Sequence, residues 1–381
     1  MPRKNSIIFF SPDYHNTFTI ANVLSNRGWK VGIWVPGDYP RQLLFSNQFV
    51  ANSIKPQEKL SATMSAVLQS IWYLGNFFKF RHHVYYSRVR KFTFFESKLG
   101  LTRLFGQDFS LALGLAKLIG VKITYVPSGC HDEISKVEFQ RITRPSVCDS
   151  CGFFEKCDDN ENNLNFQHVR RYSDLNVGLG YLESGEFIQN HIKWKVMDKE
   201  FFHSNLEIPT HLKMKISEEL KIYHGFVPSG RDSNGKNIKG SSYVVDAVER
   251  LVAQGYRVKL INVSTINSNE VRFIQAQCDV IIDQLIYGWW GSTGVEGMAL
   301  GKPVICYLRP EWKDRFMENY PEHRELPIIE ATVDSIYMVL LSILKDRSIL
   351  VKAADESLEF SKKHFDSKSN VNEFVEAIIN L

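Results

Sequence analysis

The chain has 381 residues, a formal net charge of +4 and a hydrophobic fraction of 44%. This length favours two domains, and the ordinary composition excludes a disordered, collagenous or coiled-coil protein. Six cysteines are too few for a disulfide-dense secreted scaffold, and the small charge argues against a protein that binds nucleic acid over its whole surface.

The length and composition of the apolar runs indicate where the protein is located. The run at residues 7–10 is too short for the hydrophobic region of a signal peptide. The longest uncharged run, residues 61–78, contains Ser, Thr, Gln and Asn, and we interpret it as a buried or interfacial helix and not a membrane span. We therefore expect a cytoplasmic protein.

Strand and helix patterns alternate along the first half of the chain. Strands are predicted at residues 7–10, 30–35, 91–95 and 121–126, and helices at 17–26 and 109–118. The Gly and Asp of residues 127–133 follow the last of these strands, which is typical of the ligand-binding edge of a parallel sheet. Residues 140–165 combine three cysteines with many Asp and Asn and little periodicity, which indicates a surface insertion.

The second half has a clearer α/β pattern. Strands are predicted at residues 221–227, 257–263, 279–282 and 304–307, and helices at 241–254, 293–300, 335–345 and 371–379. This alternation implies a parallel sheet that is covered on both faces. Because the mixed segment 194–215 fits an interdomain connection, we expect domains at 1–195 and 196–381.

The Gly-rich stretch at 283–304 carries the clearest chemical signal. A buried strand ends there, a loop follows, and a helix begins with the backbone amides of Gly291, Ser292 and Thr293 at its N-terminus. Free amides and the helix dipole favour a phosphate at such a position. Glu296 lies on the first turn, within reach of a ribose or sugar hydroxyl. Thr293 and Glu296 also fit a capping box, which needs no ligand, and both interpretations stay open.

Residues 296–304, Glu-Gly-Met-Ala-Leu-Gly-Lys-Pro-Val, resemble the donor-nucleotide site of the family 4 (group 1) glycosyltransferases, which have the GT-B fold. Many members carry a second Glu eight positions earlier, where this chain has Gly288. Asp283-Gln284 and the Gly-Trp-Trp-Gly loop that follows are similar to a subgroup with Asp-Gln and a Gly-aromatic-Gly loop. The resemblance covers nearly the full chain and is specific over 224–304.

A second match lies at 224–231 and at Lys239, which opens a Lys-Gly-Ser sequence. In the family, a basic pair at this place holds the donor diphosphate, so the resemblance implies this role for Arg231 and Lys239. Fixed cations there stabilise the negative charge of the departing nucleoside diphosphate. A solvated basic loop is the alternative, and Lys236 competes with Lys239.

The N-terminal half matches more weakly. The resemblance implies that the loop after residue 126 faces the interdomain cleft, where His131 or Asp132 contacts the donor sugar or the acceptor. We therefore predict both as catalytic residues together with Glu296. His15 lies where an acceptor-side residue is expected, although a lone histidine is often a structural hydrogen-bonding group.

The cysteines indicate a metal site. Cys148, Cys151 and Cys157 lie within ten residues, and Cys130 can supply a fourth thiol. A Cys-x-x-Cys pair with two more cysteines suits tetrahedral zinc, so we predict a structural zinc ion that orders the polar insertion. Unliganded thiols, a redox pair and an iron–sulfur cluster stay open as alternatives.

Residues 77–92 interleave basic and aromatic side chains. Such a stretch suits an anionic membrane surface, and membrane-associated glycosyltransferases reach lipid-linked acceptors in this way. An amphipathic segment packed on the sheet explains the pattern equally, so peripheral contact at the inner face of the membrane stays a hypothesis. No recognised nucleic-acid module is present, and we expect no nucleic-acid partner.

The resemblance implies two Rossmann-like domains facing across a cleft, acceptor-binding first and nucleotide-sugar-binding second, with the last helix crossing back. It implies transfer of a sugar from a nucleoside diphosphate sugar to a hydroxyl, with retention at the anomeric carbon and no catalytic metal. Polysaccharide or lipopolysaccharide assembly is the setting that the family suggests. A nucleotide-sugar epimerase or hydrolase stays open, as does a non-catalytic scaffold, which Gly288 at the family Glu position favours.

Overall fold

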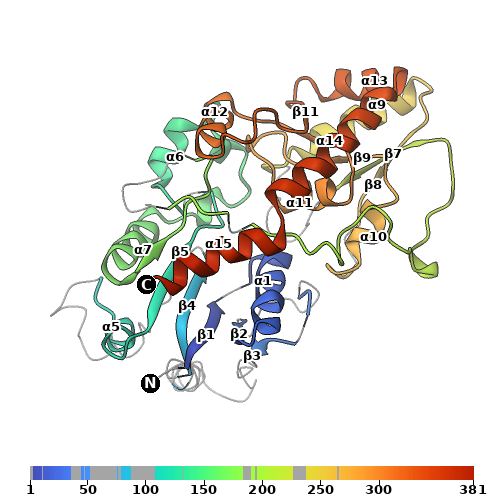
Figure 1. The fold of residues 1–381 in the computed structure, drawn as a ribbon. Coiled ribbons are helices and arrows are strands. Elements are labelled where there is room, and N and C mark those ends of the chain that lie inside the picture. Colours follow the sequence, from blue (N-terminus) through green and yellow to red (C-terminus); the bar gives the residue numbers. More distant parts are fainter. Residues whose placement is uncertain are drawn as a thin grey trace, which may run out of the picture. The chain divides into compact units, whose positions relative to one another are not determined.

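The computed structural model describes residues 3–10, 12–35, 44–46, 48–51, 75, 79–86, 108–130, 132–182, 190–193, 195–225, 237–263 and 266–381. The chain forms two compact units (Figure 1). The first comprises Met1–Phe139, Asp158–Val196 and Ser367–Leu381, and the second comprises Gln140–Cys157 and Met197–Asp366. The chain therefore enters the second unit, leaves it, enters again and ends in the first.

A parallel sheet of six strands lies at the centre of the first unit. Its strands are β1 (Arg3–Phe10), β2 (Lys30–Trp34), β3 (Val50–Ala51), β4 (Phe80–Tyr86), β5 (Lys122–Val126) and β6 (Leu175–Asn176), in the order β3-β2-β1-β4-β5-β6. The helices are α1 (Tyr14–Asn26), α5 (Leu111–Leu118), α6 (Lys136–Ile142), α7 (Asp159–Tyr172) and α15 (Ser367–Ile379), of which α6 runs into the second unit.

Alternate residues of β1 supply the two faces of this sheet. Ile7 and Phe9 pack in a cluster with residues of α1 and α15, whereas Ile8 and Phe10 pack with residues of α5 and α7. All four side chains are buried, as expected for a strand covered by helices on both faces.

The second unit has a parallel sheet of five strands. They are β7 (Leu220–His224), β8 (Val258–Ile261), β9 (Val280–Ile282), β10 (Val304–Cys306) and β11 (Ile328–Glu330), in the order β11-β10-β9-β7-β8. The helices are α9 (Ser241–Ala253), α10 (Val271–Gln275), α11 (Ser292–Ala299), α12 (Pro310–Asn319), α13 (Ile336–Lys345) and α14 (Ser348–His364). Short 3-10 turns occur at Val147–Ser150, Phe154–Lys156 and Thr210–Leu212.

These elements confirm the predicted α/β class and its two parallel sheets. The predicted strand at 91–95 and the uncharged run at 61–78 lie outside the described residues, apart from Gly75. The prediction of a surface insertion over 140–165 is wrong from Asp159 onward, where α7 begins and packs in the core of the first unit. Residues 140–157, expected in the N-terminal domain, group with the second unit.

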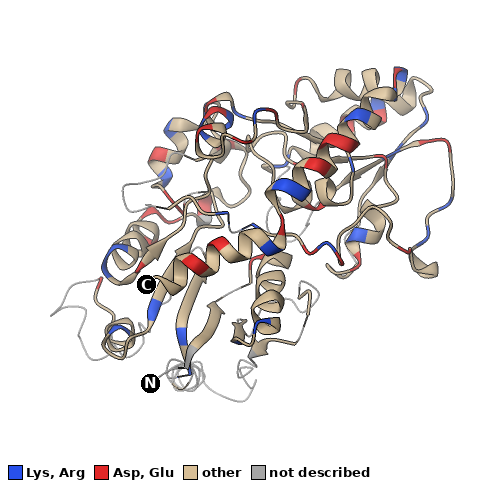
Figure 2. Ribbon diagram, in the orientation of Figure 1, with Lys and Arg blue, Asp and Glu red and all other residues tan. Residues whose placement is uncertain are grey.

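The described part of the basic-aromatic stretch is a central strand. β4 pairs with β1 on one side and with β5 on the other, and His83, Val84 and Tyr85 are fully buried. Residues 80–86 are therefore a strand of the sheet and not an amphipathic segment packed on it, so that alternative is wrong for them. Residues 77, 78 and 87–92 lie outside the described residues. Acidic and basic side chains are mixed along the helices (Figure 2). Within the described part of the chain, no helix has the length and apolar character that crossing a bilayer requires.

Candidate functional site

The second sheet contains a topological switch point. β7 is flanked by β8 and β9, so the chain moves from β7 to one side and then returns to the other. In open α/β sheets, ligands bind beyond the carboxyl ends of the strands at such a point. The residues that follow β7 and β9, together with the first turns of α9 and α11, line this edge. We call this edge the crevice.

Lys239 is a cation of the crevice. Its Nζ lies 3.3 Å from Asp283 Oδ1 and donates to Thr293 Oγ1 at 3.2 Å. The Lys239 side chain is 20% exposed, whereas that of Asp283 is fully buried. The backbone of Lys239 is held on both sides, because its N–H donates to Asn237 Oδ1 and its carbonyl accepts from Leu285 N. The ammonium group thus has a fixed position and a solvent-accessible side.

A neutral histidine joins the two central strands to α9. His224 Nδ1 lies 2.9 Å from the Ile282 carbonyl, and Nε2 lies 2.7 Å from Ser241 Oγ. Because a carbonyl only accepts, Nδ1 carries the proton and Nε2 accepts from the Ser241 hydroxyl. Burial, together with the positive charge of the neighbouring Lys239, lowers the pKa of His224 to about 4. This bridge makes a frame for the first turn of α9.

Asp283 caps α11. Its Oδ2 accepts from Gly291 N at 2.5 Å and from Gly294 N at 3.0 Å. A Cβ on Gly294 would lie 3.0 Å from that same oxygen, so only glycine fits here without displacing the cap. Of the three amides predicted to meet a phosphate, the Gly291 amide therefore donates to Asp283.

The capping-box interpretation is wrong. The N-cap of α11 is Gly291 without a side-chain hydrogen bond, and Thr293 lies inside the helix with its hydroxyl on Lys239. Glu296 Oε2 instead accepts from Gln275 Nε2 at 2.7 Å. Removal from water raises the pKa of Glu296 to about 7, although Gln275 and Lys239 act in the opposite direction. Near neutral pH this carboxyl group can therefore donate as well as accept a hydrogen bond.

Gly288, where the sequence resemblance predicts a second Glu, has a structural requirement for glycine. Its φ is +100°, and a Cβ there would lie 2.3 Å from Cγ of Arg309. Arg309 is buried, with 3% exposure, and its guanidinium donates to four carbonyl groups. These carbonyls belong to Tyr287, Ile286, Arg144 and Pro145. Arg309 thus connects the crevice loop to the segment 140–157.

Arg309 is not among the site residues that the sequence predicts. Its only local signal is an arginine directly before Pro310, and its partners lie more than 20 residues away along the chain. The two tryptophans of the same loop are buried and stacked, with Trp289 and Trp290 ring centroids 4.1 Å apart. They anchor the loop in the protein core.

The candidate residues of the first unit lie on the loop after β5. Asp132 Oδ2 accepts from Ser128 N at 2.8 Å and from Gly129 N, and the Asp132 carbonyl accepts from the Tyr125 hydroxyl. This carboxylate therefore shapes its own loop. His131 lies outside the described residues, as do Arg231 and Lys236.

The predicted zinc ligands gain no support. Cys130, Cys148, Cys151 and Cys157, all of them described, form no disulfide bond, and Cys148 is buried within a 3-10 turn. Within the described part of the chain, the side chains that bring three possible ligand atoms together are those of Glu322, His323 and His364, and not these cysteines. The turn at 147–150 is instead organised by backbone bonds and by Ser146 Oγ, which accepts from Cys148 N.

No family model matches the chain, and no curated protein sequence matches it significantly. Solved structures match over nearly the full length. HepE from Anabaena in complex with UDP and glucose has a TM-score of 0.58 at 13% identity, covering 98% of this chain and 99% of its own. Sucrose-phosphate synthase from Thermosynechococcus elongatus has a TM-score of 0.61 at 12% identity, covering 98% of both chains. An alpha-glucosyltransferase in complex with UDP and DNA has a TM-score of 0.55 at 10% identity, covering 99% of both.

At these identities the similarity defines the fold. The chain has the GT-B fold of glycosyltransferases, so the expected fold is confirmed.

Proposed function

We propose that the chain transfers a glycosyl group from a nucleoside diphosphate sugar to a hydroxyl acceptor, with the donor diphosphate in the crevice. The observation that carries this proposal is Lys239, which is fixed and partly exposed between the first turns of α9 and α11 at the switch point. Helix N-termini and a cation are what a diphosphate requires. Support also comes from HepE, which has the same fold and was solved with UDP-glucose.

The charge balance of the crevice demands a second cation. Asp283 is buried against Lys239, so the pair carries no net charge before a donor binds. We assign the additional positive charge to Arg231. Gly225, the last described residue before Arg231, lies beside Thr293, because an added Cβ on Gly225 would lie 3.1 Å from Thr293 Oγ1.

The reaction breaks the bond between the anomeric carbon and the diphosphate and forms a bond from the same carbon to the acceptor oxygen. Lys239, Arg231 and the amides of Ser292 and Thr293 stabilise the charge on the leaving phosphate. Glu296 holds a ribose or sugar hydroxyl. In the retaining course that the family resemblance suggests, the acceptor proton passes to the departing phosphate oxygen. His131 and Asp132 are assigned to the sugar and acceptor side.

The first test is calorimetric titration of the full chain with UDP, GDP, ADP and UDP-glucose. We expect one base to be preferred, and Arg231→Met to weaken its binding about ten- to hundredfold through loss of a charge-assisted contact. Lys239→Met leaves Asp283 without its cation, so it is paired with Asp283→Asn to keep the fold. Lys313→Met, which removes a 35% exposed lysine paired with Glu330, is the matched control and should bind normally.

A well-folded chain that binds none of these nucleotides overturns the proposal. Equal affinity for wild type and Arg231→Met overturns the assignment of the diphosphate to this loop.

A second candidate is a protein that binds the nucleotide sugar without turning it over. The observation that favours it is Asp283, because its carboxylate already accepts from Gly291, one of the three amides predicted to bind a phosphate, and also from Gly294. This candidate predicts UDP binding together with a rate of UDP release from UDP-glucose that no hydroxyl acceptor raises above the rate in buffer. Acceptor-dependent release excludes it.

A further inference from the structure

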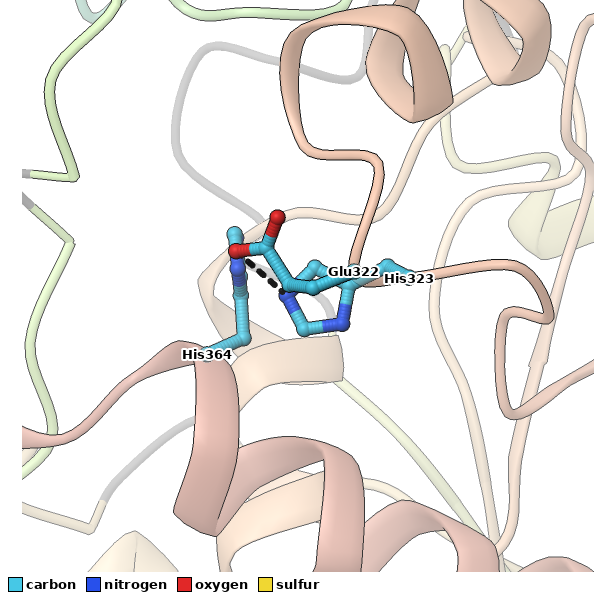
Figure 3. A group of neighbouring side chains, drawn as sticks. All are labelled: Glu322, His323 and His364. Carbon is cyan, nitrogen blue, oxygen red and sulfur yellow. Dashed lines mark ion pairs between the residues drawn. The ribbon is translucent and has the colours of Figure 1, made fainter.

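The second unit also contains a group of side chains that can ligate a metal ion, on elements other than those of the crevice. Glu322, His323 and His364 each present one ligand atom, and these three atoms lie within 4.8 Å of one another (Figure 3). His323 Nε2 lies 3.7 Å from Glu322 Oε1. The two imidazoles cross almost at a right angle, at 86°, with ring centroids 4.5 Å apart.

Two separate segments bring these residues together. Glu322 and His323 lie on the turn between α12 and β11, and His364 is the last residue of α14. The turn is tied to α14 by Lys363, whose Nζ donates to the Glu322 carbonyl at 3.2 Å. His323 and His364 are buried, with 3% and 6% exposure, whereas Glu322 is exposed at the surface rim of the group.

We propose that Glu322, His323 and His364 bind one divalent transition-metal ion, with Zn²⁺ as the ion of best fit. Two imidazole nitrogens and one carboxylate oxygen are a recurrent zinc ligand set, and a water from the rim completes four-coordination. Nitrogen ligands disfavour Mg²⁺ and Ca²⁺, which prefer oxygen. Ligand bonds of about 2.0–2.2 Å require the three side chains to draw together slightly.

Aromatic side chains hold the two histidines in place. The Phe316 ring centroid lies 5.1 Å from that of His364 and 6.1 Å from that of His323. The Phe360 centroid lies 5.2 Å from that of His364 and 4.7 Å from that of His323. Such a packed shell limits the rotamers of the two histidines. Metal binding therefore requires little rearrangement of these side chains. The same two phenylalanines contact Trp290 of the crevice loop, at 5.6 and 5.9 Å. A bound ion would therefore fix the end of α14 and the turn beneath this loop.

The test uses Co²⁺, which has similar ligand preferences to Zn²⁺ and a visible spectrum, on the full chain after treatment with chelator. We expect one equivalent to bind with a ligand-field spectrum that lacks sulfur charge-transfer bands. Glu322→Gln and His364→Gln should each weaken binding at least about tenfold, since even outer-shell changes cost that much. Glu322 is at the rim, so its variant tests the site even where His364→Gln fails to fold.

Two controls separate this site from other metal-binding groups. His211→Gln removes an exposed histidine that lies 3.4 Å from Glu270 in the same unit, and Cys148→Ser removes a thiol of the predicted zinc set. Both variants should bind Co²⁺ like wild type. Absence of stoichiometric binding, a thiolate spectrum, or unchanged affinity in Glu322→Gln overturns the proposal.

Discussion

The two sheets each contain a switch point, and the polar residues beside the two points make different contacts. In the first unit, strand order reverses between β1 and β4. Asp13, which follows β1, accepts from Lys195 Nζ at 2.9 Å, and Asn16 Oδ1 accepts from Val196 N at 2.7 Å. Asn370 of α15 donates to the Lys195 carbonyl at 2.7 Å. These bonds hold residues 195–196 and α15 against α1.

In the second unit, the corresponding polar groups bond to one another and to the first turn of a helix. Lys239 contacts Asp283 and Thr293, and Asp283 contacts the amides of α11. The Lys239 side chain stays 20% exposed. The polar groups at the first switch point thus bind a distant segment of the same chain, whereas Lys239 at the second keeps an accessible side. This difference makes the second switch point the candidate ligand site.

The largest expected effect concerns the loop that shapes the crevice. Gly288→Ala should lower the free energy of unfolding by about 3 kcal/mol or more, because it combines a strained positive φ with a collision at buried Arg309. Chemical denaturation measures this loss. Replacement by Glu should cost at least as much, since the Arg309 side chain occupies the space beside Gly288.

Gly255→Ala is the matched control for this variant. Gly255 also has a positive φ, +86°, but an added Cβ there meets nothing within 4 Å. We expect a cost of about 1 kcal/mol from the left-handed backbone conformation alone. Equal losses in the two variants would show that the contact with Arg309 does not matter.

Much of the second sheet could be predicted from the sequence, and the reason is local. Gly301 and Pro303 end α11, and the apolar face of α9 repeats with helical period, so these elements follow from short patterns. α7 was missed because its Asp- and Asn-rich sequence conceals a buried face of Phe166, Val169 and Tyr172 that exists only against the sheet. In α14, missed for the same reason, small residues such as Ala353 and Ser357 occupy buried positions.

The site divides in the same way. Lys239 and Asp283 could be predicted to lie near a diphosphate, because each belongs to a motif. Their direct pairing could not, since 44 residues separate them. Arg309 and the pair His323 and His364 carry no motif at all, and only the tertiary fold brings them to their partners.

The second prediction sharpens the contrast between the two switch points. Lys195→Met should lower the free energy of unfolding by about 1–2 kcal/mol, because Asp13 is 8% exposed and loses a charged donor, and should leave nucleotide affinity unchanged. Lys199→Met is the control, because it removes a 53% exposed lysine that pairs with Asp366. This variant should lower the free energy of unfolding by less than about 0.5 kcal/mol. A loss of nucleotide binding in Lys195→Met would break the contrast, because the first switch point would then also serve a ligand.

The smallest effect tests the protonation of Glu296. Its pKa of about 7 lies above the ordinary 4.5, so the folded chain binds a proton more tightly than the unfolded chain between these values. Stability from this group is therefore full below pH 4.5 and is lost as the pH rises through 7. Glu296→Gln keeps an acceptor for Gln275 without a charge. Its free energy of unfolding should therefore exceed that of wild type by about 1 kcal/mol at pH 8, and the two values should approach each other at pH 5. Thermal unfolding at both pH values measures the difference. If the difference instead grows toward low pH, the carboxylate is charged in the folded chain and stabilised by Lys239, and the crevice would then hold one more negative charge for a donor to overcome.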